Sequence, residues 1–473
     1  MLYVECRVAD REVERGARLG VLNALRERGY VPLIREARLH CFEQSLPGGA
    51  GAGELERAVA EWSDAEGDAP YVRGDLFCFE DYALFLVFGE PDEGASGLRA
   101  GIVYTAETDN PAQKLEALCR DAARAVEAAG GSGHAAGLSS GVEWREREQP
   151  GREIFERFAA AGEVAVPAQT PGRGPDPAAR ARAVELLEDA AARGLLRRLS
   201  EAQADGVLAS AGREAGREEL VARLAGAGLV RREVQVSCRK DGRSLFRLPS
   251  PEALAMVTAS NAVCSECGAA VADERAEELV TPTPLAASML KDGGWLVNSV
   301  RAALRALGLP PGAVAARPAD EEGEARLLAD VCGEPFLFVL RDGDFTAAHA
   351  RRALEGEAET QATRLVVVTA GRVHDEARAR LREHARRRAR AGVESEVIFA
   401  EGADAAVPEL RESVERVSRE ALARELFELD ASAGLSLSQL LAARFRLLKR
   451  PGALPDLAAS AAGALAGSLR DFN

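Results

Sequence analysis

The sequence has few aromatic residues, few histidines and no long apolar stretch. Aromatic residues make up 5% of the 473 residues, and there are five histidines. The longest strongly apolar run, "YALFLVFG" at 82–89, is far shorter than the roughly 20 apolar residues that a membrane helix needs. The N-terminus carries acidic residues from the start and lacks the basic and apolar regions of a signal peptide. We therefore expect a cytoplasmic protein without membrane association.

Motifs of nucleophilic catalysis and of nucleotide binding are also missing in their full context. The sequence contains no H-x-x-x-H and no Cys–His signature, and its G-x-S-x-G match, "GLSSG" (137–141), lies in the glycine-rich stretch that we interpret as a linker. The glycine-rich stretch "GGAGAG" (48–53) has no Lys-Ser or Lys-Thr after it, so we interpret it as a loop. The sequence therefore predicts no nucleotide cofactor and gives no support for a nucleophilic enzyme.

Charge and length limit the function classes further. The chain has 75 acidic and 60 basic residues, a net charge of -15, which argues against a general polyanion binder. Its length exceeds that of one ordinary core, so two to four domains are expected. A composition rich in Ala, Arg, Gly and Glu and poor in Lys is typical of GC-rich bacteria.

Periodicity and turn signals predict a multidomain α/β protein. Asp10 is the expected N-cap of the first helix. Short helices after 178 lead through "GAGLVRREVQV" into a strand, a pattern typical of a winged-helix domain. The expected segments are an N-terminal α/β domain at 1–130, a linker and connecting helix at 131–177, a winged-helix-like segment at 178–236, a zinc-ribbon-like segment at 237–275, an α/β domain at 276–429 and a helical tail at 430–473.

Two short loops have the form of zinc-ribbon knuckles. "CSECG" (264–268) has the complete pattern Cys-x-x-Cys-Gly, whereas "CRKDG" (238–242) has an aspartate in place of the second cysteine. The glycine allows the tight turn of a knuckle, and a carboxylate oxygen is an acceptable zinc ligand. The sequence predicts a structural zinc site formed by Cys238, Asp241, Cys264 and Cys267. The alternatives are a ribbon that has lost its metal, buried thiols that are close by coincidence, and a thioredoxin-like redox pair.

The C-terminal α/β segment carries a different pattern, from "EEGEARLLADVCGEPFLFVLRDGDFT" (321–346) to the strand "RLVVVTAG" (364–371). It resembles the core of the restriction-endonuclease-like PD-(D/E)xK superfamily. The resemblance implies an acidic metal ligand on one strand and Glu-x-Lys on the next, which hold magnesium and orient the attacking water. The Glu-x-Lys positions align with Val339 and Arg341, and the preceding acidic position falls near Arg326 or Asp330.

Valine cannot bind a cation, so the resemblance implies a degenerate nuclease fold without activity. A shifted register would instead make catalytic candidates of nearby acidic residues, namely Glu324, Asp330, Asp342 and Asp344. A Rossmann-like or receiver-like domain, in which "RDGD" is a solvated turn, is the alternative interpretation.

Two stretches are locally basic. Residues 372–390 contain eight arginines and three acids, and residues 213–247 contain nine basic and five acidic residues. Such stretches can bind phosphates, although a solvated helix face is the other interpretation. The candidate nucleic-acid-binding residues are Arg231, Arg232, Arg239, Lys240, Arg243, Arg386, Arg387 and Arg388.

Together these features predict a non-catalytic, DNA-associated regulator or an accessory subunit of a larger assembly. One alternative is a protein-interaction scaffold that does not bind nucleic acid. A second alternative is an active metal-dependent nuclease.

Overall fold

A computed structural model describes most of the chain. The described residues are 2–45, 51–66, 70–90, 97–129, 142–147, 150–165, 177–204, 215–260, 262–291, 293–317, 319–320 and 323–447. The expected mixed α/β class is confirmed, and residues 448–473 of the expected helical tail lie outside the described residues. None of the described helices is long and apolar enough to cross a membrane.

The chain divides into two compact units. Unit 1 comprises Met1–Pro150, Val331–Gly333 and Arg411–Asn473, and unit 2 comprises Gly151–Asp330 and Glu334–Leu410.

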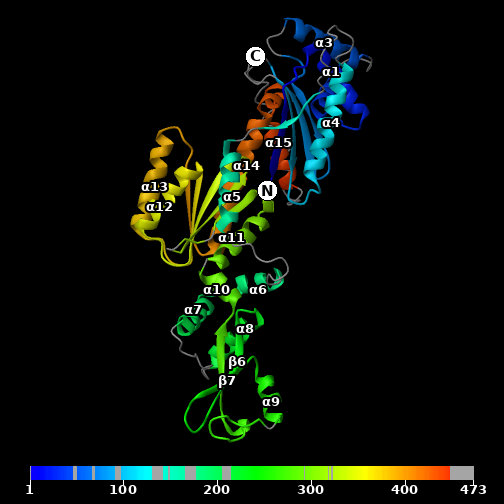
Figure 1. The fold of residues 1–473 in the computed structure, drawn as a ribbon. Coiled ribbons are helices and arrows are strands. Elements are labelled where there is room, and N and C mark those ends of the chain that lie inside the picture. The colour runs from blue at the N-terminus through cyan, green and yellow to red at the C-terminus, as the bar shows by residue number, and fades with distance from the viewer. Residues whose placement is uncertain are drawn as a thin grey trace. The chain divides into compact units, whose positions relative to one another are not determined.

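Unit 1 contains an antiparallel sheet in the order β2-β3-β4-β1-β5 (Figure 1). Strand β3 is apolar at nearly every position, as expected for a strand that is covered on both faces. The strands are β1 (Tyr3–Ala9), β2 (Gly74–Cys78), β3 (Tyr82–Phe88), β4 (Leu98–Tyr104) and β5 (Arg145–Glu146).

Helices cover both faces of this sheet. One apolar core joins the sheet to α1 and α4, and a second joins the opposite face to α14 and α15. Helix α4 places Leu115, Leu118 and Ala122 toward the core at helical spacing. The helices of this unit are α1 (Arg15–Glu27), α2 (Leu33–Ser45), α3 (Ala52–Glu66), α4 (Pro111–Ala129) and α15 (Leu437–Leu447), with α14 (Ala403–Ala433) entering from unit 2.

The first helix begins later than the sequence predicts. Asp10 does not cap it, because β1 continues to Ala9 and the Asp10 carboxylate accepts a hydrogen bond from Arg145 at 2.7 Å. Helix α1 starts at Arg15, and the N-cap residue Glu14 makes no side-chain cap bond. Residues 46–50, which include part of the expected "GGAGAG" loop, lie outside the described residues, and α3 begins at Ala52.

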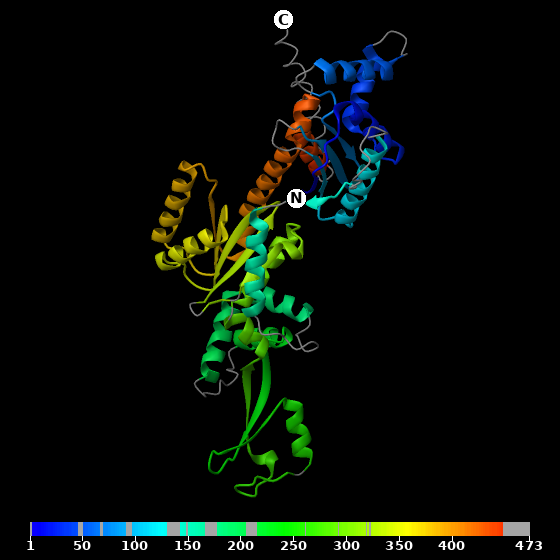
Figure 2. The same cartoon turned by 45° about the horizontal axis from the view of Figure 1, so that its top comes forward.

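Unit 2 begins with helices followed by a three-stranded antiparallel sheet, whose long strand pair is called the β6–β8 hairpin below. Strands β6 (Val230–Ser237) and β8 (Arg275–Pro282) pair antiparallel over their whole length, and β7 (Ser244–Leu248) pairs with the other edge of β6. The preceding helices are α5 (Pro150–Ala165), α6 (Pro177–Leu187), α7 (Ala190–Ala204) and α8 (Ala215–Gly226). Helix α9 (Pro251–Ala259) and the short helix η2 (Val271–Asp273) lie in the chain that connects β7 to β8 (Figure 2).

The remainder of unit 2 contains a five-stranded sheet in the order β13-β12-β11-β10-β9. Strands β9 and β10 are antiparallel, and β11, β12 and β13 are parallel. Apolar side chains of β10, β11 and β12 pack with α12 and α13 on one face. The elements are α10 (Pro284–Lys291), α11 (Gly294–Ala306), η3 (Pro311–Ala313), β9 (Val314–Arg317), β10 (Glu324–Val331), β11 (Glu334–Arg341), α12 (Ala347–Thr360), β12 (Arg364–Thr369), α13 (Asp375–Arg390) and β13 (Glu396–Glu401).

Candidate metal centre

The end of the β6–β8 hairpin brings together residues that are far apart in the sequence. The last pair of the ladder is Ser237 with Arg275. The next residues in this antiparallel register are Cys238 and Glu274, so the hairpin itself places a thiol opposite a carboxylate.

Two knuckles with the same backbone geometry surround this point. The amide of Cys238 donates to the carbonyl of Arg243 at 2.8 Å, and the amide of Cys264 donates to that of Ala269 at 2.7 Å. In each knuckle the glycine amide then donates back to the first cysteine carbonyl, at 2.8 Å and 2.9 Å. Both glycines have a left-handed backbone, with φ of +74° at Gly242 and +78° at Gly268.

The thiols of Cys238, Cys264 and Cys267 and a carboxylate oxygen of Glu274 all lie within 4.8 Å of one another. In a tetrahedral site with zinc–sulfur bonds of about 2.3 Å, neighbouring sulfurs are separated by about 3.8 Å. The four ligand atoms would therefore need to approach one another by less than the length of one zinc–sulfur bond to form a tetrahedral shell. Among the described residues, this is the one group of such side chains that is close enough to hold a metal.

Hydrogen bonds orient the carboxylate within the group. Glu274 accepts a hydrogen bond from the Cys267 thiol at 2.9 Å and another from the amide of Arg239. The carboxylate raises the pKa of the Cys267 thiol to about 12, and the same bond holds the pKa of Glu274 below its usual range. A cation bound here would take the place of this thiol proton, because thiolates are the metal-binding form of cysteine.

The structure gathers the three predicted cysteines and adds Glu274, which the sequence did not indicate as a ligand. Asp241 lies outside the group of four. Its carboxylate accepts a hydrogen bond from the amide of Arg243 at 3.0 Å, and this bond, with the nearby Cys238 thiol, lowers the pKa of Asp241. No local sequence signal marks Glu274. It lies directly before β8, and the pairing of β8 with β6, which ends directly before Cys238, brings it to the thiols.

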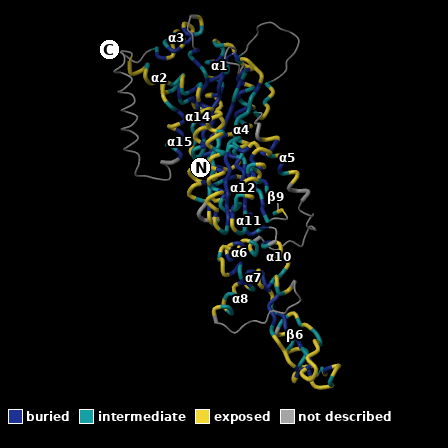
Figure 3. The backbone as a smooth tube through the Cα atoms, turned by 90° about the vertical axis from the view of Figure 1, so that its left-hand side faces the viewer, coloured by how far each residue is buried: buried dark blue, intermediate teal, exposed yellow. Residues whose placement is uncertain are grey.

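The apolar core around the knuckles is small. Val234, Val236 and Val271 are its buried members, with a few half-buried side chains around them. Between residues 239 and 270, the described part of the chain is mostly exposed or half-buried (Figure 3). So little buried apolar surface leaves a role for a metal in holding the knuckles together.

The eight basic candidates fall into two groups. Five form ion pairs with acidic neighbours, namely Arg231 with Glu233, Arg232 with Glu218 and Glu278, Arg243 with Glu266, Arg386 with Glu383 and Arg388 with Glu357. Arg239, Lys240 and Arg387 are exposed and form no ion pair with the described acidic residues. These three side chains are the ones that remain available to an anionic partner.

The structure does not bring the candidate catalytic aspartates together into a metal-binding group within the described ranges. Asp330 lies half-buried on β10. Asp342 accepts a hydrogen bond from the Trp295 indole at 2.9 Å and pairs with two arginines of α7. Asp344 is 60% exposed and accepts from the amide of Arg372 at 2.9 Å.

The remaining positions that the nuclease resemblance singles out are engaged in structural contacts. Glu324 is buried on β10 and forms an ion pair with Arg326 at 3.2 Å. Val339, at the position of the catalytic Glu, is fully buried in the apolar core of the sheet. Arg341, at the position of the catalytic Lys, donates to the backbone carbonyl of Asp344 at 2.9 Å.

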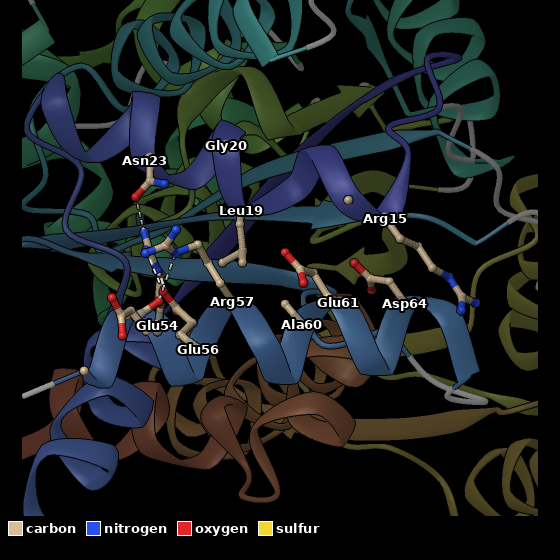
Figure 4. Close-up of a pocket in the computed structure, with 14 residues that line it drawn as sticks. Arg15, Leu19, Gly20, Asn23, Glu54, Glu56, Arg57, Ala60, Glu61 and Asp64 are labelled. Carbon is tan, nitrogen blue, oxygen red and sulfur yellow. Dashed lines mark hydrogen bonds and ion pairs between the residues drawn. The ribbon is translucent and has the colours of Figure 1, made fainter. Parts of the chain in front are cut away.

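Unit 1 contains a cavity of about 810 Å³ along α1 and α3 (Figure 4). Arg35 is one of the lining residues and forms a 2.7 Å ion pair with Glu56 and a hydrogen bond with Asn23. Both acidic and basic side chains line the cavity, including Arg15 and Asp64. This mixed lining indicates no particular class of ligand.

Comparison of the chain with family models, with curated proteins and with solved structures finds no match. A function for this protein is therefore inferred from the geometry of the chain itself.

Proposed function

We propose that this protein is a non-catalytic, DNA-associated accessory protein in which a structural zinc ion closes the end of the β6–β8 hairpin. The group of three thiols and one carboxylate carries this proposal. Thiolates favour zinc among the abundant divalent cations, and four protein ligands leave no open position for substrate. The ion therefore serves a structural role.

The elements around the hairpin support a winged-helix-like interpretation. Helices α6, α7 and α8 precede β6, and the β6–β8 hairpin takes the place of the wing. In winged-helix and helix-turn-helix proteins the last helix enters the major groove of DNA and the hairpin contacts the backbone. In this protein the first zinc knuckle lies at the end of that hairpin and presents Arg239 and Lys240.

The five-stranded sheet supports the proposed lack of catalytic activity. From α11 to β12 the chain forms a helix, three consecutive strands, a second helix and a fourth strand that is parallel to the third. The nuclease family that the sequence resembles has the same order of elements. A buried valine and an arginine bound to backbone occupy the positions of the catalytic Glu-x-Lys. We propose that this segment is a degenerate nuclease core.

Metal analysis is the first test. Elemental analysis of the purified protein should give one zinc per chain, and Cys264→Ser should lose it. Cys41→Ser removes an exposed thiol outside the group and serves as the matched control. A wild-type protein that contains no zinc and does not take it up would refute the zinc proposal.

DNA binding is tested by fluorescence polarisation with duplex and single-stranded DNA at two salt concentrations. R239Q/K240Q should weaken binding and reduce the salt slope by about 2, since each phosphate contact contributes about 0.9. R152Q/R157Q removes the same charge from two arginines paired within α5 and serves as the control. Binding that is absent, or that changes equally in both variants, would contradict DNA contact at the knuckle.

A protein-interaction scaffold is the second candidate. Two observations favour it: five of the eight basic candidates are already paired with acids, and the chain between the knuckles exposes Met256 and Val263. Affinity purification from the native host, with and without nuclease treatment, separates the candidates. A stoichiometric partner that survives nuclease treatment and is lost in M256S/V263S would favour the scaffold.

A further inference from the structure

The two knuckles share two backbone hydrogen bonds and a left-handed glycine, which makes their fourth residues directly comparable. The fourth residue is Cys267 in the second knuckle and Asp241 in the first. Each precedes a glycine of the same left-handed conformation, and each knuckle is closed by the same two backbone hydrogen bonds. Asp241 therefore occupies the position of the missing fourth thiol.

The same correspondence extends to the side chains. The amide of Ala269, two residues beyond Cys267, is near enough to the Cys267 sulfur to favour the thiolate form of this side chain. The amide of Arg243, two residues beyond Asp241, donates to one carboxylate oxygen of Asp241 at 3.0 Å. The Cys238 thiol is close enough to the Asp241 carboxylate to lower its pKa. The backbone thus orients Asp241 as it orients the cysteine ligand, beside one of the three thiols.

Glu274 reaches the same site from the opposite strand. It is held there by the amide of Arg239, the residue directly after Cys238. A tetrahedral zinc ion with three thiolates has one remaining position. The Glu274 carboxylate lies within the group, and the Asp241 carboxylate lies outside it on the neighbouring knuckle, near the Cys238 thiol.

We infer that the zinc centre has five ligand residues and that the carboxylates of Glu274 and Asp241 alternate in its fourth coordination position. This inference rests on the proposed zinc site and specifies its chemistry. Exchange between the two carboxylates forms one zinc–oxygen bond as it breaks the other, so the shell stays closed and no charge is gained or lost. The centre would accordingly exchange its metal faster than a ribbon with four thiolates, because carboxylate is the weaker and harder ligand.

A double-mutant cycle on zinc affinity tests this inference. The affinities of E274Q, D241N and E274Q/D241N are measured by competition with a chromophoric zinc chelator. We expect each single substitution to weaken zinc binding by less than about tenfold and the double substitution by more than about a hundredfold. Glu277→Gln, in the strand that follows Glu274 and paired with Arg275, is the control and should bind zinc like the wild type.

A gain of ligand provides a second, independent readout. D241C places a thiol where the first knuckle lacks one, so zinc should bind more tightly and E274Q should then have no further effect. In cobalt-substituted protein, the thiolate charge-transfer absorption should rise from that of three thiolates to that of four. D241S, which has a side chain of similar size and no thiol, should show neither change.

The outcomes separate this inference from the zinc proposal beneath it. A wild-type protein that binds no zinc refutes both. Stoichiometric zinc that is lost in E274Q and unaffected by D241N identifies Glu274 as the sole fourth ligand and overturns the exchange. Loss in D241N with no effect of E274Q assigns the position to Asp241 alone and overturns it equally.

Discussion

Removal of zinc should open the end of the β6–β8 hairpin and leave the rest of unit 2 folded. The five-stranded sheet and the knuckles differ in the contacts that stabilise them. The five-stranded sheet has an extensive apolar core with fully buried side chains on both faces. The knuckles have three buried valines and the four grouped ligands.

The size of the effect follows from linkage. A metal that binds only the folded form stabilises it by about 2.7 kcal/mol when free zinc exceeds its dissociation constant a hundredfold. Amides that exchange through opening of the hairpin end should then exchange about a hundredfold more slowly with zinc than with a chelator. Each further tenfold rise in free zinc should add about 1.4 kcal/mol.

Hydrogen exchange measured by mass spectrometry gives the assay. The reporter amides are those that close the knuckles, at Cys238, Gly242, Cys264 and Gly268. Amides of β12, which is buried along its length, should exchange at the same rate in both conditions. Equal protection of the knuckle amides with zinc and with chelator would refute the idea that the metal holds this end of the hairpin.

Three further predictions concern single positions. Gly268→Ala forces a side chain into a left-handed backbone at a cost of about 1–2 kcal/mol, so zinc affinity should fall five- to thirtyfold, whereas Gly216→Ala within α8 should leave it unchanged. Asp342→Asn leaves two arginines without their acidic partner, so the free energy of unfolding should fall by about 1–3 kcal/mol and calorimetry should show a lower unfolding temperature. The same substitution at the exposed Asp344 should leave the unfolding temperature unchanged. Burial raises the pKa of Asp75 to about 6, above its unfolded value of about 3.9, so folded unit 1 retains the proton and its stability falls as pH rises from about 4 to 6. Asp75→Asn should flatten that pH dependence in urea unfolding, and an unchanged slope would contradict the shift.

The knuckles could be predicted from the sequence because their geometry is local. Five consecutive residues determine each turn, and the glycine at the end permits the positive φ that the turn requires. The spacing within and between the two turns is therefore enough to identify Cys238, Cys264 and Cys267 as members of one group.

The fourth member of the group could not be predicted in the same way. Glu274 reaches the thiols because β6 and β8 pair in one particular register, and this register depends on contacts between segments that are far apart in the sequence. A shift of one residue would move Glu274 away from Cys238 and turn its side chain to the other face. Local spacing carries no information about such a pairing.

The first helix shows the same limit of local patterns. Asp10 has the residue type and the position of an N-cap, and local propensity favours it there. The structure uses Asp10 in an ion pair with Arg145, a residue from a distant segment of unit 1, and Val13 packs into the core before α1 begins. A tertiary contact thus overrides the local preference of Asp10. At Glu274, likewise, a contact between distant segments determines the role of the residue.

The aspartate in the first knuckle is best understood together with the glutamate on the facing strand. If Asp241 were a cysteine, the two knuckles alone would complete a four-thiolate shell, and Glu274 would be a buried carboxylate beside it with no role in binding. Burial of a carboxylate is costly unless it is hydrogen-bonded or bound to a cation. Glu274 is only 8% exposed, and one of its two hydrogen bonds comes from the Cys267 thiol, whose proton a bound cation would replace. The buried glutamate and the missing thiol therefore account for each other. In the proposed site Glu274 would supply the ligand that the first knuckle lacks, and a bound metal would connect both strands of the hairpin instead of the two knuckles alone.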